Sequence, residues 1–470
     1  MYLVAGLGVT GQSVLRYFQT QGEPCLAFDT RVDFDVSELQ KQFPEVQFAL
    51  GEIPNSWLKK FEFVVLSPGI AKSEPWVTAL QKIEKQIIGD IELFSRAVGV
   101  PVIAITGSNG KSTVTTLTGL VLQEAGYSVG VGGNIGQPAL DLLIDDNEYD
   151  VYVLELSSFQ LETTYSLATI SATVLNISED HMDRYQAIED YIHAKTKVFA
   201  ETDLAVIPKD SGLEALIHNG DVARFCLQDG CIESDMDYGV IYQNNQAWLG
   251  HGAHPQVPVS CMKMQGMHHQ LNALAMLALC RPFNVENQHF ENVLSSFSGL
   301  PHRTELVEVA HHISWVNDSK GTNVGATVTA IQSIGEQARQ AKGQLILIAG
   351  GVGKDADFSG LKQPVETYCK QVILLGRDQD IIANAISKAG QYSVNDVQIT
   401  KVEDLASAVA IALENAVPND YVLFSPACAS FDQYANYVKR GEHFVELVHQ
   451  ACNVIHINEQ VEINEQADIN

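Results

Sequence analysis

The stretch with the clearest chemistry is the TGSNGKST run of residues 106–113, which follows the apolar run 102–106 and opens a helical pattern. Backbone N–H groups at a helix start point toward an anion and carry the positive end of the helix dipole. Lys111 supplies a charge for outer phosphates, and a hydroxyl of Ser112 or Thr113 can bind Mg²⁺. The spacing is shorter than the common GxxxxGK[ST]. We expect a nucleotide phosphate site, with an ordinary strand–turn–helix connection as the alternative.

Two more polar side chains follow strand-like runs, and a third lies on the helical stretch after them. Glu155 comes after the run 151–154, His181 after the run 173–177, and Lys195 lies on the next helical stretch. Strand ends of a parallel sheet meet at one edge, so these groups can gather there. A carboxylate near a phosphate loop suits a second Mg²⁺, although the ion prefers oxygen to imidazole. A surface-loop histidine is the alternative for His181 alone.

The N-terminal residues show a glycine pattern, Gly6-x-Gly8-x-x-Gly11, followed by Asp29 after the second apolar run. This arrangement fits a dinucleotide fingerprint. Taken alone it fits NAD and other nucleotide-like ligands equally well. The separate phosphate loop at 106–113 makes another diphosphate the better expectation.

The C-terminal third has polar loops after three strand-like runs. They are Asn317–Asn323, Gly350–Lys354 and the loop that contains Ser430. Each loop by itself could simply connect strands. Together they predict a site for a small anionic molecule.

The composition excludes several classes of protein. The 470 residues carry 29 Lys+Arg and 57 Asp+Glu, a formal net charge of −28, which argues against general binding to nucleic acid or anionic lipid. No stretch of about 18 uncharged apolar residues occurs, so we expect no membrane span. The N-terminus lacks signal-peptide features, and we expect a cytoplasmic protein. The eight cysteines form no CxxC, so we expect reduced thiols, and no zinc site at Cys226 and Cys231.

Alternating strand-like and helical runs predict an α/β fold with parallel sheets. Strands are expected at 2–5, 63–66, 87–88, 102–106, 151–154, 173–177, 313–316, 345–349, 372–375 and 421–424, and a buried helix at 266–279. Changes in pattern divide the chain into units 1–96, 97–299 and 300–450. Residues 451–470 contain a near repeat and no Lys or Arg, and we expect an acidic mobile tail.

The motifs together resemble those of the Mur ligases, from Leu3 to about Leu447. The matching segments are 106–113, Leu154–Gln160, Asn176–Asp183, Leu300–Arg303, Asn317–Asn323 and Ser425–Asp432. The resemblance implies three domains: a Rossmann-like N-terminal domain for a UDP-substrate, a central P-loop-type parallel-sheet ATPase domain, and a Rossmann-like C-terminal domain for an amino acid. The Ser-Ser-Phe-Gln and Ser-Pro-Ala-Cys runs match the branch of the family that adds D-glutamate.

The resemblance implies an ATP-dependent carbon–nitrogen ligase of peptidoglycan precursor synthesis. ATP would phosphorylate the carboxylate of UDP-N-acetylmuramoyl-L-alanine, and the amino group of D-glutamate would attack the acyl phosphate. The donor carboxylate and the γ-phosphate are both anions, so Lys111 and two Mg²⁺ would screen their approach. The implied partners are these small molecules, and we expect a monomer.

The resemblance also assigns residues. ATP binding falls to Gly107, Asn109, Gly110, Lys111, Ser112, Thr113, Asn272, Arg303 and Asp318, and metal binding to Ser112, Glu155, His181 and a carbamylated Lys195. The catalytic set is Lys111, Glu155, His181 and Lys195, with His181 orienting the donor carboxylate or serving as a base. The UDP-substrate set is Thr10, Asp29, Thr30, Arg31, Gly69, Asn134, Ser157 and Gln160, of which Asn134 also borders the nucleotide. The D-glutamate set is Thr322, Lys354, Ser430, Phe431 and Tyr437.

Two positions depart from the family pattern. His269 stands where the family usually has Asn, and Val352 replaces an Asp near Lys354. The alternatives are a Mur-type or folylpolyglutamate-like ligase with another amino acid, an oxidoreductase, and a nucleotide-binding regulator without catalysis. The N-terminal glycine domain argues against the folate enzyme, and the phosphate loop argues against the oxidoreductase.

Overall fold

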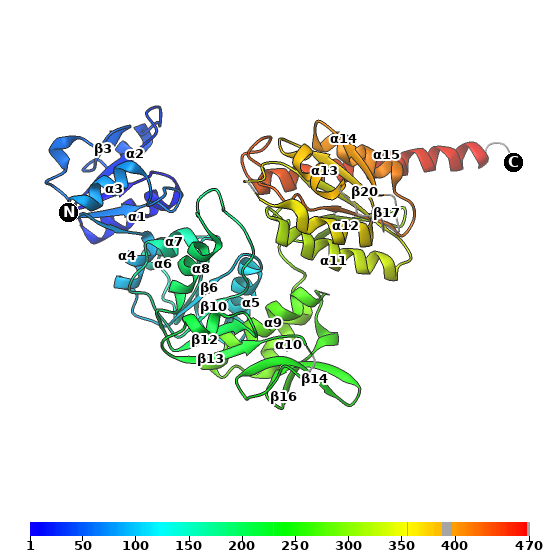
Figure 1. Cartoon of the computed structure of the whole chain (residues 1–470), viewed down its shortest axis with the longest axis horizontal. Helices are drawn as coiled ribbons and strands as arrows, with labels where there is room; N and C mark the ends of the chain where they lie inside the picture. The colour runs from blue at the N-terminus through cyan, green and yellow to red at the C-terminus, as the bar shows by residue number, and fades with distance from the viewer. Residues whose placement is uncertain (229, 265, 355, 388–396, 468–470) are drawn as a thin grey trace. The chain divides into compact units, whose positions relative to one another are not determined.

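Strands and helices alternate along most of this computed structural model, which describes residues 1–228, 230–264, 266–354, 356–387 and 397–467 (Figure 1). Of residues 453–467 only the backbone is described. The chain forms two compact units, one of residues 1–177 and 187–297, the other of 178–186 and the residues from 298 onward. The predicted α/β class is confirmed, with mainly parallel strand pairs in both units and antiparallel pairs only at β14–β15, β15–β16 and β17–β18 in the part of the chain that the structure describes.

The N-terminal sheet is parallel throughout, in the order β3-β2-β1-β4-β5. Its strands are β1 (Tyr2–Ala5), β2 (Cys25–Asp29), β3 (Gln47–Leu50), β4 (Phe63–Leu66) and β5 (Gln86–Ile88). The helices are α1 (Val9–Gln21), α2 (Ser37–Gln42), α3 (Pro75–Lys82) and α4 (Asp90–Ala97). The chain leaves β1 and β4 in opposite directions across the sheet, and ligands of open α/β sheets typically bind where the strand order reverses in this way.

The central sheet has the order β16-β15-β14-β13-β12-β10-β6-β8-β7. Its strands are β6 (Val102–Thr106), β7 (Val129–Gly133), β8 (Val151–Glu155), β10 (Ser171–Val174), β12 (Leu204–Pro208), β13 (Asp221–Phe225), β14 (Asp237–Gln243), β15 (Gln246–His251) and β16 (His254–Pro258). A small pair, β9 (Ala168–Thr169) and β11 (Glu201–Thr202), lies beside it. The helices are α5 (Lys111–Glu124), α6 (Ala139–Ile144), α7 (Ser158–Glu162), α8 (Ile188–Thr196), α9 (Met267–Leu279) and α10 (Asn287–Ser296).

Alternate residues of β6 face opposite sides of this sheet. Ile103 and Ile105 join the core beneath α5 and α9, whereas Val102 and Ala104 join a core shared with the N-terminal sheet. Apolar residues on both faces are what a sheet covered on two sides requires. The predicted strand at 173–177 is wrong in position: β10 ends at Val174 because its partner β6 ends at Thr106, where the phosphate loop turns away.

The C-terminal sheet has the order β17-β18-β22-β19-β20-β21, with β17 antiparallel to β18 and the other pairs parallel. The strands are β17 (Glu305–Ala310), β18 (Ile313–Asn317), β19 (Leu345–Gly350), β20 (Cys369–Leu375), β21 (Gln398–Lys401) and β22 (Tyr421–Phe424). The helices are α11 (Val324–Gln340), α12 (Lys362–Tyr368), α13 (Gln379–Ser387), α14 (Leu405–Asn415) and α15 (Tyr437–Ala467). Leu345 and Leu347 pack beneath α11 and α12, and Ile346 and Ile348 pack beneath α14 and α15.

The expected tail from residue 451 is helical up to Ala467, as a continuation of α15. The sequence after Gly441 contains no Gly or Pro, so nothing in it breaks the helix. Residues 468–470 lie outside the described residues. No helix in the described part of the chain is both long and apolar enough to span a bilayer.

The expectation of reduced thiols throughout is wrong for one pair. Cys226 and Cys231 form a disulfide, with their Cα atoms 6.3 Å apart. The turn after β13 brings the two residues together, and both are buried. The described groups of His, Cys, Asp and Glu include none arranged to hold a metal ion by themselves.

Candidate active site

The phosphate loop connects the fully buried strand β6 to α5. The side chain of Asn176 braces the loop: its Oδ1 accepts from the Asn109 N–H at 2.8 Å, and its Nδ2 donates to the Asn109 carbonyl at 3.0 Å. Gly110 has φ +84°, and a Cβ there would lie 2.7 Å from Oδ1 of Asn272. This position therefore needs glycine for its backbone conformation and for its clearance from α9.

Two lysine ammonium groups reach one carbonyl oxygen of the loop. Nζ of Lys111 donates to Gly107 O at 2.8 Å and to Ser108 O at 2.9 Å. Nζ of Lys195, from α8, donates to the same Gly107 O at 2.9 Å. Lys195 is only 2 % exposed, and its ammonium lies 4.6 Å from the ring centre of Tyr191. The structure thus concentrates positive charge beside the loop, where an anionic phosphate would be stabilised.

Glu155 is held by two polar side chains at the end of β8. Oε2 accepts from the hydroxyl of Ser112 at 2.5 Å, and Oε1 accepts from Nδ2 of Asn134 at 2.9 Å. The Glu155 side chain is buried, and Ser112 lies in the first turn of α5. A buried carboxylate and a hydroxyl side by side are hard oxygen donors of the kind that Mg²⁺ binds.

The start of α9 carries two adjacent histidines, His268 and His269, whose ring centres are 3.8 Å apart. Burial lowers the pKa of His269 to about 3, so its imidazole is neutral at physiological pH. Nδ1 of His269 is buried with no hydrogen-bond partner among the described atoms. The residue that replaces the usual Asn therefore presents a neutral ring one helical turn before Asn272.

At the N-terminal sheet, Asp29 follows β2 and faces the turn after β1. Its Oδ2 accepts from the Leu7 N–H at 2.8 Å, and Arg31 donates to both oxygens, from Nε at 2.8 Å and Nη2 at 2.7 Å. Burial alone would raise the pKa of Asp29, but these bonds lower it to about 2. Thr10, in the first turn of α1, and Gly69, after β4, lie at the same edge of the sheet.

Ser157 and Gln160 have a structural use in this chain. They form a capping box at the start of α7, in which Ser157 Oγ accepts from the Gln160 N–H and Gln160 Oε1 accepts from the Ser157 N–H. The amide of Gln160 also donates to Asp90 at 3.1 Å. Burial raises the pKa of Asp90 to about 6. The pair therefore connects the central domain to α4.

In the second unit, Asp318 lies directly after β18. Its carboxylate accepts from Ser425 Oγ at 2.7 Å and from the Thr304 N–H at 3.1 Å. Burial raises the pKa of Asp318 to about 7, although the charges of Arg303 and Arg440 oppose the shift. The loops after β18 and β22 are thereby joined through one buried carboxyl group.

Lys354 forms an ion pair with Asp180, a residue 174 positions earlier, at 3.3 Å between Nζ and Oδ1. The other oxygen of Asp180 accepts from Nδ2 of Asn323 at 3.1 Å. The loop 178–186 belongs to this unit, and it also carries His181, whose Nε2 lies 3.6 Å from Asp180 Oδ2. Asp180 therefore supplies a carboxylate beside Lys354 where Val352 removes one.

The other predicted amino-acid residues belong to the same unit as this pair. Ser430 is buried and follows β22, whereas Phe431 is 72 % exposed. Tyr437 begins α15 and lies under the Lys320 ammonium, 4.0 Å from its ring centre. Thr322 precedes the N-cap residue of α11, Asn323.

Comparisons with known proteins identify the family of this chain. Residues 1–89 match the family model described as "Mur ligase MurD-like, N-terminal domain", 105–280 match "Mur ligase middle domain", and 302–428 match "Mur ligase, glutamate ligase domain". The UDP-N-acetylmuramoylalanine--D-glutamate ligase of Hydrogenovibrio crunogenus is 58 % identical over 96 % of this chain and 98 % of its own length. The chain belongs to the Mur ligase family.

A second relative of this Mur ligase, from Legionella pneumophila strain Paris, has the same name and is 40 % identical over 95 % of the chain and 98 % of its own length. Among solved structures, the Thermotoga maritima MurC matches with TM-score 0.59 at 17 % identity, over 96 % of this chain and 99 % of that one. The T. maritima MurF matches with TM-score 0.60 at 15 % identity, over 96 % and 95 %. At these identities the structures show a shared fold, which confirms the three-domain prediction.

Some residues of this Mur ligase site were not predicted. Asp180 stood inside a recognised motif, yet nothing in the sequence indicated that it would pair with Lys354. Arg440 was also missed: its guanidinium donates to Ser319 O at 2.9 Å and to Cys428 O at 3.0 Å, and it is buried. In the sequence, Arg440 shares a helix face with the apolar residues Phe444 and Val448, and this pattern could have indicated a buried arginine. Only the fold shows which loops the arginine joins.

Proposed function

We propose that this Mur ligase joins D-glutamate to UDP-N-acetylmuramoyl-L-alanine at the expense of ATP. The observation that carries the proposal is its 58 % identity, over almost the full length of both chains, to a ligase of that name. The phosphate loop with Lys111 and Lys195 is chemically suitable for ATP. The edge of the N-terminal sheet at Asp29 is suitable for the UDP-substrate, and the Lys354 loop is suitable for D-glutamate. The reaction serves peptidoglycan precursor synthesis.

The proposed reaction has two steps. A carboxylate oxygen of the UDP-substrate attacks the γ-phosphorus of ATP, and ADP leaves, which gives an acyl phosphate. The amino group of D-glutamate then attacks the acyl carbon, inorganic phosphate leaves, and the amine loses a proton. Lys111 would bind the outer phosphates during the first step, because its ammonium already lies at the phosphate loop. We assign His181 to the donor carboxylate or to the amine proton.

The oxygen donors at Ser112 and Glu155 fit a magnesium site. Bound Mg²⁺ would neutralise phosphate charge and allow two anions to approach. Lys195 would contribute to a second site as a carbamate, which presents oxygen atoms in place of an ammonium. The shared carbonyl of Gly107 supports this assignment, since two ammonium groups at one acceptor repel each other and a carbamate would reverse the charge of one.

Lys354 and Ser430 suit the two carboxylates of D-glutamate, as a cation and a hydroxyl donor. Asp180 would orient Lys354 through their ion pair. We propose that the enzyme acts in the cytoplasm, where ATP and the UDP-substrate are available, and that it acts as a monomer.

The test is phosphate release from ATP and Mg²⁺ in the presence of UDP-N-acetylmuramoyl-L-alanine, with one amino acid added at a time. Release that requires D-glutamate, and is not given by L-glutamate, L-alanine, L-lysine or diaminopimelate, supports the proposal. Release with another amino acid would mean that the enzyme is a Mur ligase for that amino acid. Absence of release with every amino acid, despite ATP binding, supports a regulator instead.

A further inference from the structure

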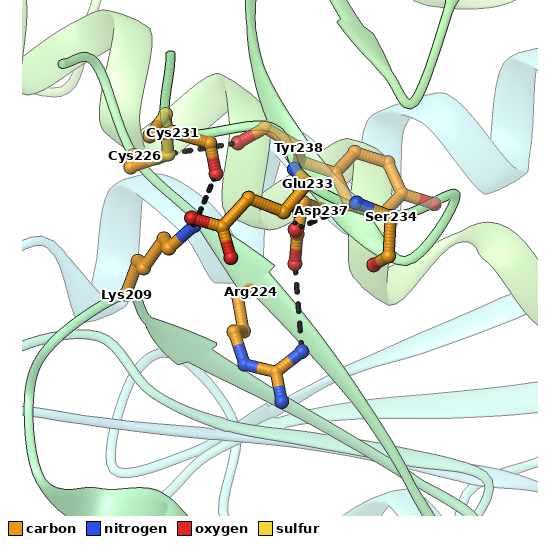
Figure 2. The surroundings of a disulfide bond; sticks show 8 residues. All are labelled: Lys209, Arg224, Cys226, Cys231, Glu233, Ser234, Asp237 and Tyr238. Carbon is orange, nitrogen blue, oxygen red and sulfur yellow. Dashed lines mark hydrogen bonds and ion pairs between the residues drawn. A yellow bond between two sulfur atoms is a disulfide. The ribbon is translucent and has the colours of Figure 1, made fainter. Parts of the chain in front are cut away.

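The disulfide between Cys226 and Cys231 closes the turn that leaves β13 in the central domain (Figure 2). Both cysteines are less than a tenth exposed. In proteins kept among reducing agents, disulfides are typically transient and have catalytic or redox-sensing roles. The surroundings of this pair therefore indicate what a change of redox state would alter.

A charged cavity lies next to the disulfide, and Lys209 connects the two. The carbonyl of Cys231 accepts from Nζ of Lys209 at 2.6 Å, and the same ammonium pairs with Glu233 at 3.0 Å. Lys209, Glu233, Arg224 and Asp237 all line a cavity of about 900 Å³. The side chains of Lys209 and Glu233 approach each other directly below the disulfide in Figure 2. Reduction would free Cys231 from Cys226 and loosen the carbonyl that holds Lys209.

The far end of the turn is anchored without sulfur. The buried carboxylate of Asp237 accepts from the N–H groups of Glu233 at 2.8 Å and Ser234 at 3.0 Å. It also lies 3.5 Å from a guanidinium nitrogen of Arg224. Reduction would therefore remove one of the two anchors of residues 231–235, and the domain would keep its fold.

The anchored turn also contacts Arg281, which follows α9, the helix that packs against the phosphate loop. Nη1 of Arg281, two residues after the end of α9, donates to Asp235 O at 3.1 Å and to the Tyr238 hydroxyl at 3.4 Å. Near the middle of α9 (Met267–Leu279), Asn272 lies against Gly110 of the phosphate loop. A continuous set of contacts thus runs from the turn to the nucleotide site through one rigid helix.

We propose that Cys226 and Cys231 are a reversible dithiol–disulfide switch that sets the affinity of the phosphate-loop site for ATP. Two molecules of a low-molecular-weight thiol supply two electrons and two protons, which leaves two cysteine thiols and one oxidised thiol dimer. The reduced state has an acceptor in place, since Cys226 Sγ lies 3.8 Å from the Tyr238 carbonyl. The oxidised turn holds Asp235 and hence Arg281 in position, so the oxidised protein binds ATP more tightly.

The switch rests on the proposed function only for its ATP site, so the test measures ATP binding and not turnover. The full chain is equilibrated in buffers of oxidised and reduced glutathione and then alkylated. Mass spectrometry should show two more alkylated cysteines in the reduced form, at residues 226 and 231. Titration with Mg·ATP should give a Kd about threefold to tenfold lower for the oxidised form. Amide exchange in residues 230–235 should be faster in the reduced form.

Three variants test the assignment. C226S/C231S should bind ATP like the reduced protein in every buffer, and C261S, which removes a free cysteine of the same domain, should respond like the wild type. R281Q should keep the two-thiol change but lose the change in Kd. The proposal is overturned if the two cysteines do not change with redox buffer, or if they change and the Kd of the wild type does not. A missing requirement for D-glutamate would overturn only the amino-acid assignment.

Discussion

Lys111 and Lys195 donate to the same oxygen, the carbonyl of Gly107, at 2.8 and 2.9 Å. Lys111 is the first residue of α5, and Lys195 lies in the last turn of α8. The two ammonium groups meet where the phosphate loop leaves β6. Two like charges at one acceptor are costly, and an anionic ligand or a change in one of the lysines relieves the cost. This pairing links the loop geometry to the proposed carbamate.

Replacing Lys195 with alanine should lower kcat by about 10²-fold or more, because it removes an electrostatic group of the reaction centre. Acetate should restore part of the activity, since it is a small carboxylate that can stand in for the carbamate. The measurement is phosphate release against acetate concentration.

Lys197 offers the matched control, because its ammonium donates to the Glu162 carbonyl and not to the phosphate loop. K197A should keep most activity and show no response to acetate. Equal acetate responses of K195A and K197A, or no rescue of K195A at any concentration, would contradict the carbamate assignment.

Replacing Asp180 with asparagine should raise the KM for D-glutamate by about tenfold, which corresponds to about 1.4 kcal/mol. The neutral amide cannot hold the Lys354 ammonium as the carboxylate does. Steady-state kinetics with D-glutamate varied would show the effect. E179Q removes the charge of the exposed neighbouring carboxylate and should leave this KM unchanged. A similar rise of KM in both variants would mean that the loss of one negative charge, and not the Asp180–Lys354 pair, causes the effect.

The sequence was sufficient to predict a loop between a strand and a helix at residues 106–113, because glycine spacing reveals its local backbone geometry. The same holds for β1 and α9, whose apolar patterns are continuous. The Asp180–Lys354 pair could not be predicted, since the partners are separated by 174 residues and only the folded loops bring them together. Ser157 and Gln160 show a different limit of the sequence. Their motif predicted a role in binding the UDP-substrate, but it did not predict that the two residues also cap a helix.

Asp90 should make stability depend on pH in a defined direction. Its pKa rises from 3.8 to about 6 on folding, so the native state binds the proton more tightly than the unfolded state. The free energy of unfolding of the wild type should therefore fall, relative to D90N, as pH rises from 4 to 6, by at most about 1.4 kcal/mol per pH unit. Thermal midpoints of the two proteins across this range test it, and parallel curves would contradict it.

Arg440 should not tolerate lysine. Its planar guanidinium donates from Nε to Ser319 Oγ and from Nη2 to the Ser319 and Cys428 carbonyls, which one ammonium cannot reproduce. R440K should destabilise the protein by about 2 kcal/mol or more in denaturant titrations. K439A, which breaks an exposed ion pair one residue away, should cost under about 0.5 kcal/mol. An R440K variant as stable as the wild type would show that the loops of Ser319 and Cys428 do not depend on the Arg440 guanidinium.

The disulfide also marks a limit of sequence reasoning. The spacing of Cys226 and Cys231 was visible, but a turn that brings two sulfur atoms together depends on where β13 ends and β14 begins. Composition described the chain as a whole and could not separate one oxidised pair from six free thiols.

The central claim is that ATP activates the UDP-substrate as an acyl phosphate. UDP-N-acetylmuramoyl-L-alanine labelled with ¹⁸O in its carboxylate should be incubated with ATP, Mg²⁺ and D-glutamate, and the released phosphate analysed by mass spectrometry. The account predicts one ¹⁸O atom in each phosphate, together with an amide product that keeps the other. Unlabelled phosphate, formed while the amide product accumulates, would contradict it.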